Sequence, residues 1–408
     1  MRRTNQRGFT LIELLIAAVL LLILIGPLFS FLRVGQSNRS TSIRTTDVEQ
    51  NARAAMITIG RDITNAGFSF APQVRLGTAS LFSNLSGPPN TQGDYLLTPL
   101  IPGNNLNQIR VGTDSGGSPI FNTTDQITLA TVDQSFNNGL PLTGNYNVAG
   151  SSATFTVTAG TLTGLFVGNL LFLNRGTVFA ISVITSIDPG TNTITIANTD
   201  SFQINNFGVI TNMPTTLNQP LNDLALPIAG LPIQPPILAY RFSFITFYAD
   251  IDGNLIRREI LPPPHTVAGG NDVVGVAQVN PSGNTYNCNG TCYYDNIIAT
   301  GIEDLQFSYN IADPQPVAGI NTPIDDPGYN GRASNAGTAP DYRLNDIREV
   351  NVSLKVRAAD RDNQIKVTSA TEIDRGKGYL YRFTLDGTFG VRNIFRTNFT
   401  NVPAPAGP

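Results

Sequence analysis

The chain begins with MRRTNQRG (residues 1–8) and continues with FTLIELLIAAVLLLILIGPLFSFL (residues 9–32). The second stretch is almost wholly apolar and is longer than the about 20 residues that a helix needs to cross the hydrocarbon core of a bilayer. The first stretch is basic and contains no acid, which favours a cytoplasmic N-terminus. Together they predict an N-terminal membrane helix with the rest of the chain outside the cytoplasm.

Two simpler explanations of this start fit less well. A cleaved secretory signal has an apolar region of about 7–15 residues followed by a small-residue cleavage site, whereas this run is longer and ends in FSFLRVGQ. A plain signal anchor gives no reason for Glu13. A carboxylate in a membrane helix costs free energy and indicates a functional site by default.

Residues 8–17 read GFTLIELLIA, and this string resembles the signal of type IV prepilins. The resemblance implies that a prepilin peptidase cleaves after Gly8 and that Phe9, the new terminus, is N-methylated. It also implies that Glu13 pairs with the terminal amine of Phe9 in a neighbouring subunit, inside a packed filament core. Breaking such a buried pair by removing one partner costs about 3–5 kcal/mol, so the pair would set the register of assembly.

The helix is expected to continue beyond the apolar stretch, to about Ala66. Gly26 and Pro27 interrupt the apolar run, and proline removes a backbone donor, so a kink or local unwinding is expected there. Gly67 supplies a stop signal. Between these points, residues spaced three and four apart form one mostly apolar stripe that should lie on a sheet. The stripe contains Val48, Ala52, Ala55, Ile59, Asp62, Ile63 and Ala66.

Charged residues are scarce in the whole chain. They make up 13% of its 408 residues, against about 25% in an ordinary globular chain. The formal net charge is −3, from 26 basic and 29 acidic residues, which does not favour a dedicated nucleic-acid-binding protein. One His and two Cys leave few ligands for zinc, haem or iron–sulfur centres. The composition is typical of a β-rich protein with a neutral surface outside the cytoplasm.

The sequence after residue 70 predicts a β-rich body. Residues 71–125 are rich in Pro, Gly, Asn and Ser, which predicts loops with short strands. Short β-branched runs then indicate a small antiparallel barrel or sandwich inserted in the body. These runs are residues 126–132, 153–158, 170–173, 178–184 and 192–197, and a Pro-studded connection follows at 203–238.

The last third of the chain returns to longer strands. Residues 240–248 and 255–260 flank the turn Asp250-Ile251-Asp252-Gly253-Asn254, which predicts a hairpin. Alternating apolar and polar residues predict further strands near 305–309, 350–356 and 379–385. The predicted fold class is α+β, with a long N-terminal pilin-type helix packed on an antiparallel β-sheet and a small inserted β-barrel or sandwich.

The chain is therefore expected to divide into five parts along the sequence. They are a leader (1–8), a transmembrane or filament-core helix (9–32), an amphipathic half of the same helix (33–67), a loop-rich region with the inserted β subdomain (68–238) and a C-terminal antiparallel sheet (239–408).

Segments beyond the leader are similar to PilW-like minor pilins. They are the end of the helix (51–68), IEDLQFSY (302–309), IREVNVSLKVR (347–357) and the closing residues 383–393. GNLL at 168–171 resembles the glycine-led barrel strand of that family, although Asn169 stands where an Asp is more usual. The J-type pseudopilins of type II secretion are related and start in the same way, but they are usually much shorter.

Cys288 and Cys292 are expected to form a disulfide that closes a small loop, because the export signal places them in an oxidising compartment. A metal site there would need more ligands than the nearby sequence provides.

Other candidate sites are interpreted as ordinary loops. Asp250, Asp252 and Asn254, and the pair Asp325–Asp326, fail the spacing of a calcium loop. His265 stands without a recognisable nucleophile partner, and the sequence contains no phosphate loop and no GxSxG elbow. We therefore expect no catalytic residue, metal, cofactor or small-molecule substrate, and the chain is not expected to be an enzyme.

The resemblance implies a PilW-like minor pilin of a type IV pilus, held in the inner membrane by a single span before it enters the extracellular filament. Its bulky body favours a tip or initiation complex with other minor and major pilins, supporting pilus biogenesis, adhesion, motility or DNA uptake. Two alternatives stand beside it. One is a pseudopilin of a type II secretion system, in a periplasmic pseudopilus. The other is a tip adhesin whose β insert binds a surface ligand, a glycan or DNA.

Overall fold

A computed structural model describes residues 10–67, 75–76, 95–96, 99–113, 117–133, 136–176, 178–198, 205, 207, 220–228, 234–260, 293–311, 347–358, 362–366 and 378–391. The chain divides into two compact units, Met1–Gln50 with Arg357–Phe383, and Asn51–Val356 with Thr384–Pro408. An N-terminal helix and a large antiparallel sheet make the fold α+β, as predicted.

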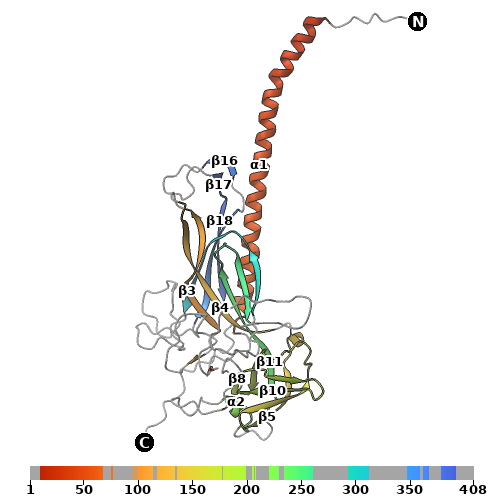
Figure 1. Ribbon diagram of the computed structural model, residues 1–408, viewed down its shortest axis with the longest axis vertical. Coiled ribbons are helices and arrows are strands. Elements are labelled where there is room, and N and C mark those ends of the chain that lie inside the picture. Colours follow the sequence, from red (N-terminus) through yellow and green to blue (C-terminus); the bar gives the residue numbers. More distant parts are fainter. Residues whose placement is uncertain are drawn as a thin grey trace, which may run out of the picture. The chain divides into compact units, whose positions relative to one another are not determined.

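The helix α1 spans Leu11–Asn65 and ends where the sequence predicts (Figure 1). Every residue of the predicted stripe is at most 5% exposed, and Ile59 and Ile63 are fully buried. Gly67 adopts a positive φ of 75°, a conformation that glycine tolerates best. Its N–H donates to the carbonyl of Ala130, which ties the end of the helix to a strand.

Within the second unit, the last turns of α1 pack closely on strands. Gly60 lies against the ring of Phe389, at a distance that leaves no room for a Cβ. Asp62 lies 5% exposed on the buried stripe, and the Nε of Arg257 donates to its carboxylate at 2.6 Å. A small residue and a paired acid therefore let this part of the helix approach the sheet.

Five strands of the largest sheet form the part next to this end of the helix. β3 (Leu100–Thr113), β4 (Pro119–Val132), β11 (Ile237–Ala249), β12 (Leu255–Ile260) and β13 (Tyr293–Ala299) are antiparallel neighbours in that order. The predicted hairpin at 250–254 is confirmed, since Ala249 pairs with Leu255.

The prediction of only short strands in residues 71–125 is wrong for β3, which is 14 residues long. The alternation of apolar and polar residues that would predict this strand is interrupted by Pro102, Gly103 and several Asn. The strand accommodates them through a register shift between Gly103 and Asn107, and Asn105 has a φ of 52°. Breaks of this kind are tolerated at a strand that pairs on one side only, and β3 pairs with β4 alone among the described strands.

The inserted subdomain is a small closed barrel. It contains β5 (Leu142–Ala149), β6 (Ser152–Ala159), β7 (Leu170–Arg175), β8 (Val178–Val183), β9 (Ser186–Asp188) and β10 (Thr193–Ala197). The first half of β11 pairs with both β5 and β7. β8 pairs with β7, and the chain continues into β9, which pairs with β10. Since β10 pairs with β6 and β6 with β5, the ring is complete.

The barrel has its own apolar core and a fixed connection to the rest of the sheet. Phe155, Leu171 and Ile194 are fully buried in this core. A short 3-10 helix (Phe136–Gly139) and the short helix α2 (Pro220–Asp223) flank the barrel. At the junction on β11, Arg241 binds the Asp133 carboxylate and the Gly164 carbonyl, and its guanidinium lies 5.2 Å from the ring centre of Phe136.

A separate three-stranded sheet has the order β14 (Ile302–Ile311), β15 (Ile347–Arg357) and β18 (Arg382–Gly390). The strand expected at 379–385 is wrong in its position, because β18 begins only at Arg382. Gly378–Tyr379 instead form β17, which pairs with β16 (Asp362–Lys366). A last described pair joins β1 (Arg75–Leu76) to β2 (Tyr95–Leu96).

Candidate functional site: the N-terminal half of α1

The first half of α1 exposes its apolar side chains on every side. Apart from Ile25, all large apolar side chains between Leu11 and Val34 are exposed, from 47% at Val19 to 84% at Leu11. Fully burying a single Leu or Ile is worth about 1.5–3 kcal/mol. A helix with this many exposed apolar residues therefore requires an apolar environment from outside its own chain. By length and composition α1 qualifies as a membrane span.

The helix begins with a capping box formed by Thr10 and Glu13. The backbone N–H of Thr10 donates to Oε2 of Glu13 at 2.9 Å, and its hydroxyl donates to the same oxygen at 3.0 Å. In return, the N–H of Glu13 donates to the Thr10 hydroxyl at 3.4 Å. This reciprocal arrangement satisfies backbone donors that have no partner within a helix.

The capping box uses only one oxygen of the Glu13 carboxylate. No residue within the described ranges, 10–67 and those that follow, donates to Oε1 of Glu13. The side chain is exposed and carries a charge beside exposed apolar residues. It therefore retains a charged acceptor for a cation from outside the described residues.

The helix remains α-helical through Gly26 and Pro27. The local unwinding expected at this position is not seen, and a kink in the membrane environment stays a prediction. A helix tolerates an internal proline when the freed carbonyl finds another partner or the helix bends gently. Gly8 and Phe9, the predicted sites of cleavage and methylation, lie outside the described residues.

One family model matches this part of the chain. Residues 3–29 match the prokaryotic N-terminal methylation motif. This match supports a type IV prepilin-like protein. The matched region contains Gly8, Phe9, the capping box and most of the exposed apolar segment. No curated protein and no solved structure matches the chain.

The methylation motif and the exposed apolar helix both bear on the first half of α1 in this prepilin-like chain. The motif suggests processing by a prepilin peptidase and assembly with other pilins. The exposed apolar helix fits both membrane anchoring and later packing against other helices. Either environment would remove this surface from water, since lipid tails and apolar side chains are both apolar.

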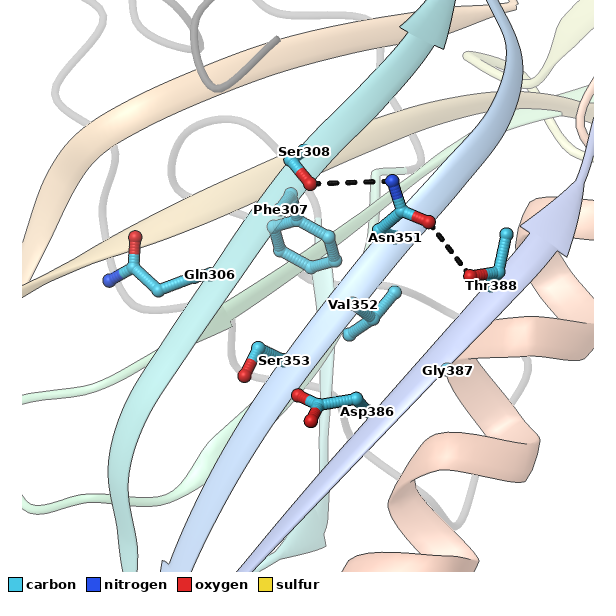
Figure 2. A pocket seen from close by; sticks show the side chains of 9 residues that line it. All are labelled: Gln306, Phe307, Ser308, Asn351, Val352, Ser353, Asp386, Gly387 and Thr388. Atoms are coloured by element: carbon cyan, nitrogen blue, oxygen red, sulfur yellow. Dashed lines mark hydrogen bonds between the residues drawn. The ribbon is translucent and has the colours of Figure 1, made fainter. Parts of the chain in front are cut away.

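The three-stranded sheet carries a second candidate feature, a hollow of about 430 Å³ (Figure 2). Asn351 connects its neighbours, since its amide donates to Ser308 at 3.4 Å and its carbonyl accepts from the Thr388 hydroxyl at 2.8 Å. The lining residues are Gln306, Phe307, Ser308, Asn351, Val352, Ser353, Asp386, Gly387 and Thr388. Asp386 is the lining residue that could act as a general base, and no His, Cys or Lys lines the hollow beside it.

In the acidic turn at 250–254, backbone and side-chain groups of the turn itself occupy the carboxylate of Asp250. Oδ1 of Asp250 accepts from the N–H groups of Asp252 and Asn254, and Oδ2 accepts from the Asn254 side chain at 2.8 Å. Gly253 has a φ of 80°, which the turn requires. The interpretation of this segment as a hairpin turn is confirmed, and no group of three metal-ligating side chains occurs among the described residues.

The predicted disulfide pair Cys288–Cys292 lies outside the described residues, and so do His265 and Asp325–Asp326, which are interpreted as loop residues. Sequence reasoning also missed two features that the structure shows. The capping box could have been predicted from the sequence, because Thr10-x-x-Glu13 has the spacing that defines it. The pairing of Asp62 with Arg257 could not have been predicted, since the two residues are far apart in the sequence.

Proposed function

We propose that the chain is a PilW-like minor pilin of a type IV pilus. In this proposal, a prepilin peptidase removes the leader, the exposed half of α1 holds the protein in the inner membrane, and the same surface then packs into the filament. The observation that carries the proposal is the combination of the methylation motif with a helix whose apolar side chains are exposed in its first half, apart from Ile25, and packed on its own body in its second.

The size of the body supports a place at the tip or in an initiation complex. α1 ends at Asn65, and the chain continues to Pro408 with a complete additional barrel on β11. A subunit repeated along a thin filament must fit beside its neighbours at a short helical rise. A barrel attached to the body hinders such repetition, whereas the end of a filament leaves it room.

The proposed role is structural and adhesive rather than enzymatic. The described hollow on the three-stranded sheet is lined by one carboxylate, Asp386, with no His, Cys or Lys, and the sequence lacks the motifs of common hydrolases and nucleotide-binding enzymes. The proposed partners are the peptidase, other minor pilins and the major pilin, with no cofactor.

Deletion combined with immunogold labelling tests the proposal. Deletion is expected to reduce the number of surface pili strongly, and antibody to the body is expected to label the ends of the remaining wild-type filaments. Label distributed along whole filaments would contradict the tip position. Normal piliation together with a loss of exoprotein secretion would contradict the pilin role and would instead support a pseudopilin of a type II secretion system.

A further inference from the structure

The outer face of the barrel carries a regular grid of uncharged polar side chains on β5, β6 and β10. In one row, Asn145 pairs with Thr156, and Thr156 pairs with Thr193. Residues that are directly paired point to the same face of a sheet. The hydroxyls of Thr156 and Thr193 lie 3.3 Å apart, as expected of neighbours in such a row.

A second row lies two residues further along the same strands. Asn147 pairs with Thr154, and Thr154 pairs with Thr195. Asn147 and Thr154 are exposed, and Thr195 is half-buried. Strands lie about 4.8 Å apart, and alternate residues of one strand about 6.7 Å, so the six side chains form a grid. We call these two rows the polar grid.

The apolar core of the barrel supports the polar grid from the inner side of its strands. Its strands turn Phe155, Ile194 and Ile196 inward, and all three are fully buried in the barrel core. The closed ring of strands fixes the spacing of the grid before any ligand arrives. A preorganised surface loses little conformational freedom on binding, which favours even weak individual contacts.

Most of the grid has hydrogen-bonding capacity to spare. The side chains of Asn145, Asn147, Thr154 and Thr195 make no hydrogen bond to any group in the described part of the chain. Each Thr hydroxyl both donates and accepts, and each Asn amide offers two donors and one acceptor. The face therefore presents donors and acceptors together, without a preferred sign of charge.

The barrel is nearly free of charge. In residues 142–197 the only charged side chains are Arg175 and Asp188. Arg175 donates to the carbonyls of Leu224 and Leu226 at 2.6 and 3.2 Å. Asp188 accepts from the Thr191 hydroxyl and the Gly190 N–H, and these bonds hold its pKa below the ordinary value. Both charges are thus engaged by the protein itself.

We propose that the polar grid is a binding surface for a neutral polysaccharide. Nucleic acid would require Lys or Arg for its phosphates, and an anionic membrane surface would require the same. A lipid interior or an apolar protein surface would require exposed apolar side chains, and the six grid positions have none. A chain of uncharged sugars presents closely spaced hydroxyls that donate and accept, and it matches a face of Thr and Asn.

A pull-down of the purified full-length protein in detergent micelles tests this inference, with microcrystalline cellulose and chitin as neutral probes. We expect saturable binding to at least one of them that is unchanged between low and high salt, because no ion pair is involved. Anionic carboxymethylcellulose is expected to bind no better. The assay needs no filament, so its outcome is independent of the proposed role in pili.

The decisive variant is Thr154→Val with Thr195→Val, which removes two hydroxyls from the second row while keeping shape and β-propensity. It is expected to raise the Kd by about tenfold, since each hydrogen bond contributes modestly. The matched control is Thr123→Val with Thr384→Val, at exposed strand positions outside the barrel, and it should bind like wild type. Absence of binding to both neutral probes, equal effects of the two double variants, or binding lost at high salt would overturn the inference.

Discussion

Two acidic side chains of α1, Glu13 and Asp62, are placed on apolar stretches in the two halves of the helix, but they are held differently. Asp62 is 5% exposed, and Arg257 of its own chain neutralises it at 2.6 Å. Glu13 is exposed, and within the described residues its carboxylate accepts only from Thr10. An acid among apolar groups needs a compensating partner. The second half of the helix contains that partner, whereas the described residues supply none to the first half.

The largest effect is expected from removing the acid that has its partner within the chain. Asp62→Ala should lower the free energy of unfolding of the body by about 3–5 kcal/mol, because Arg257, which is mostly buried, loses its 2.6 Å partner and keeps only the longer 3.4 Å contact with Glu259. Chemical denaturation in detergent, followed by fluorescence of the body's tyrosines, measures it. The double variant Asp62→Leu with Arg257→Met should recover most of the loss. An unchanged midpoint for Asp62→Ala would show that the pair does not hold the helix to the sheet.

A smaller effect is expected from truncating one isoleucine in each half. Ile63→Ala should cost about 2–5 kcal/mol, since Ile63 is fully buried and the truncation leaves a cavity. Ile23 is 62% exposed, so Ile23→Ala should change the unfolding of the body by no more than about 0.5 kcal/mol. Equal losses for both variants would mean that the first half of α1 also packs on its own chain.

Much of the fold was readable from local pattern. The stripe from Val48 to Ala66, the stop at Gly67 and the hairpin at Asp250–Asn254 each rest on spacing or turn chemistry within a few residues, and all three are confirmed. β3 could not be predicted in the same way, because Pro102 and Asn105 interrupt its alternation of apolar and polar residues. A bulge lets the folded strand keep its pairing with β4 across this interruption.

The functional features also differ in how far the sequence predicts them. The exposed apolar helix and Glu13 stand out in one sequence, because a charge in an apolar run is unusual wherever it occurs. The closure of the barrel, the alignment of the polar grid and the pairing of Asp62 with Arg257 depend on strand register between distant segments. Register is set by the whole packed structure, so composition alone does not predict it.

The most direct test of the central claim is the filament content of cells that carry Glu13→Gln. Glutamine also serves in a capping box, so this variant keeps the helix start and loses only the charge. We predict normal leader cleavage and normal membrane levels, with the protein absent from sheared filaments. Thr10→Val is the matched control, because it keeps the charge and loses the cap, at a cost of about 1 kcal/mol. It should still enter filaments. Incorporation of Glu13→Gln at the wild-type level would contradict the account.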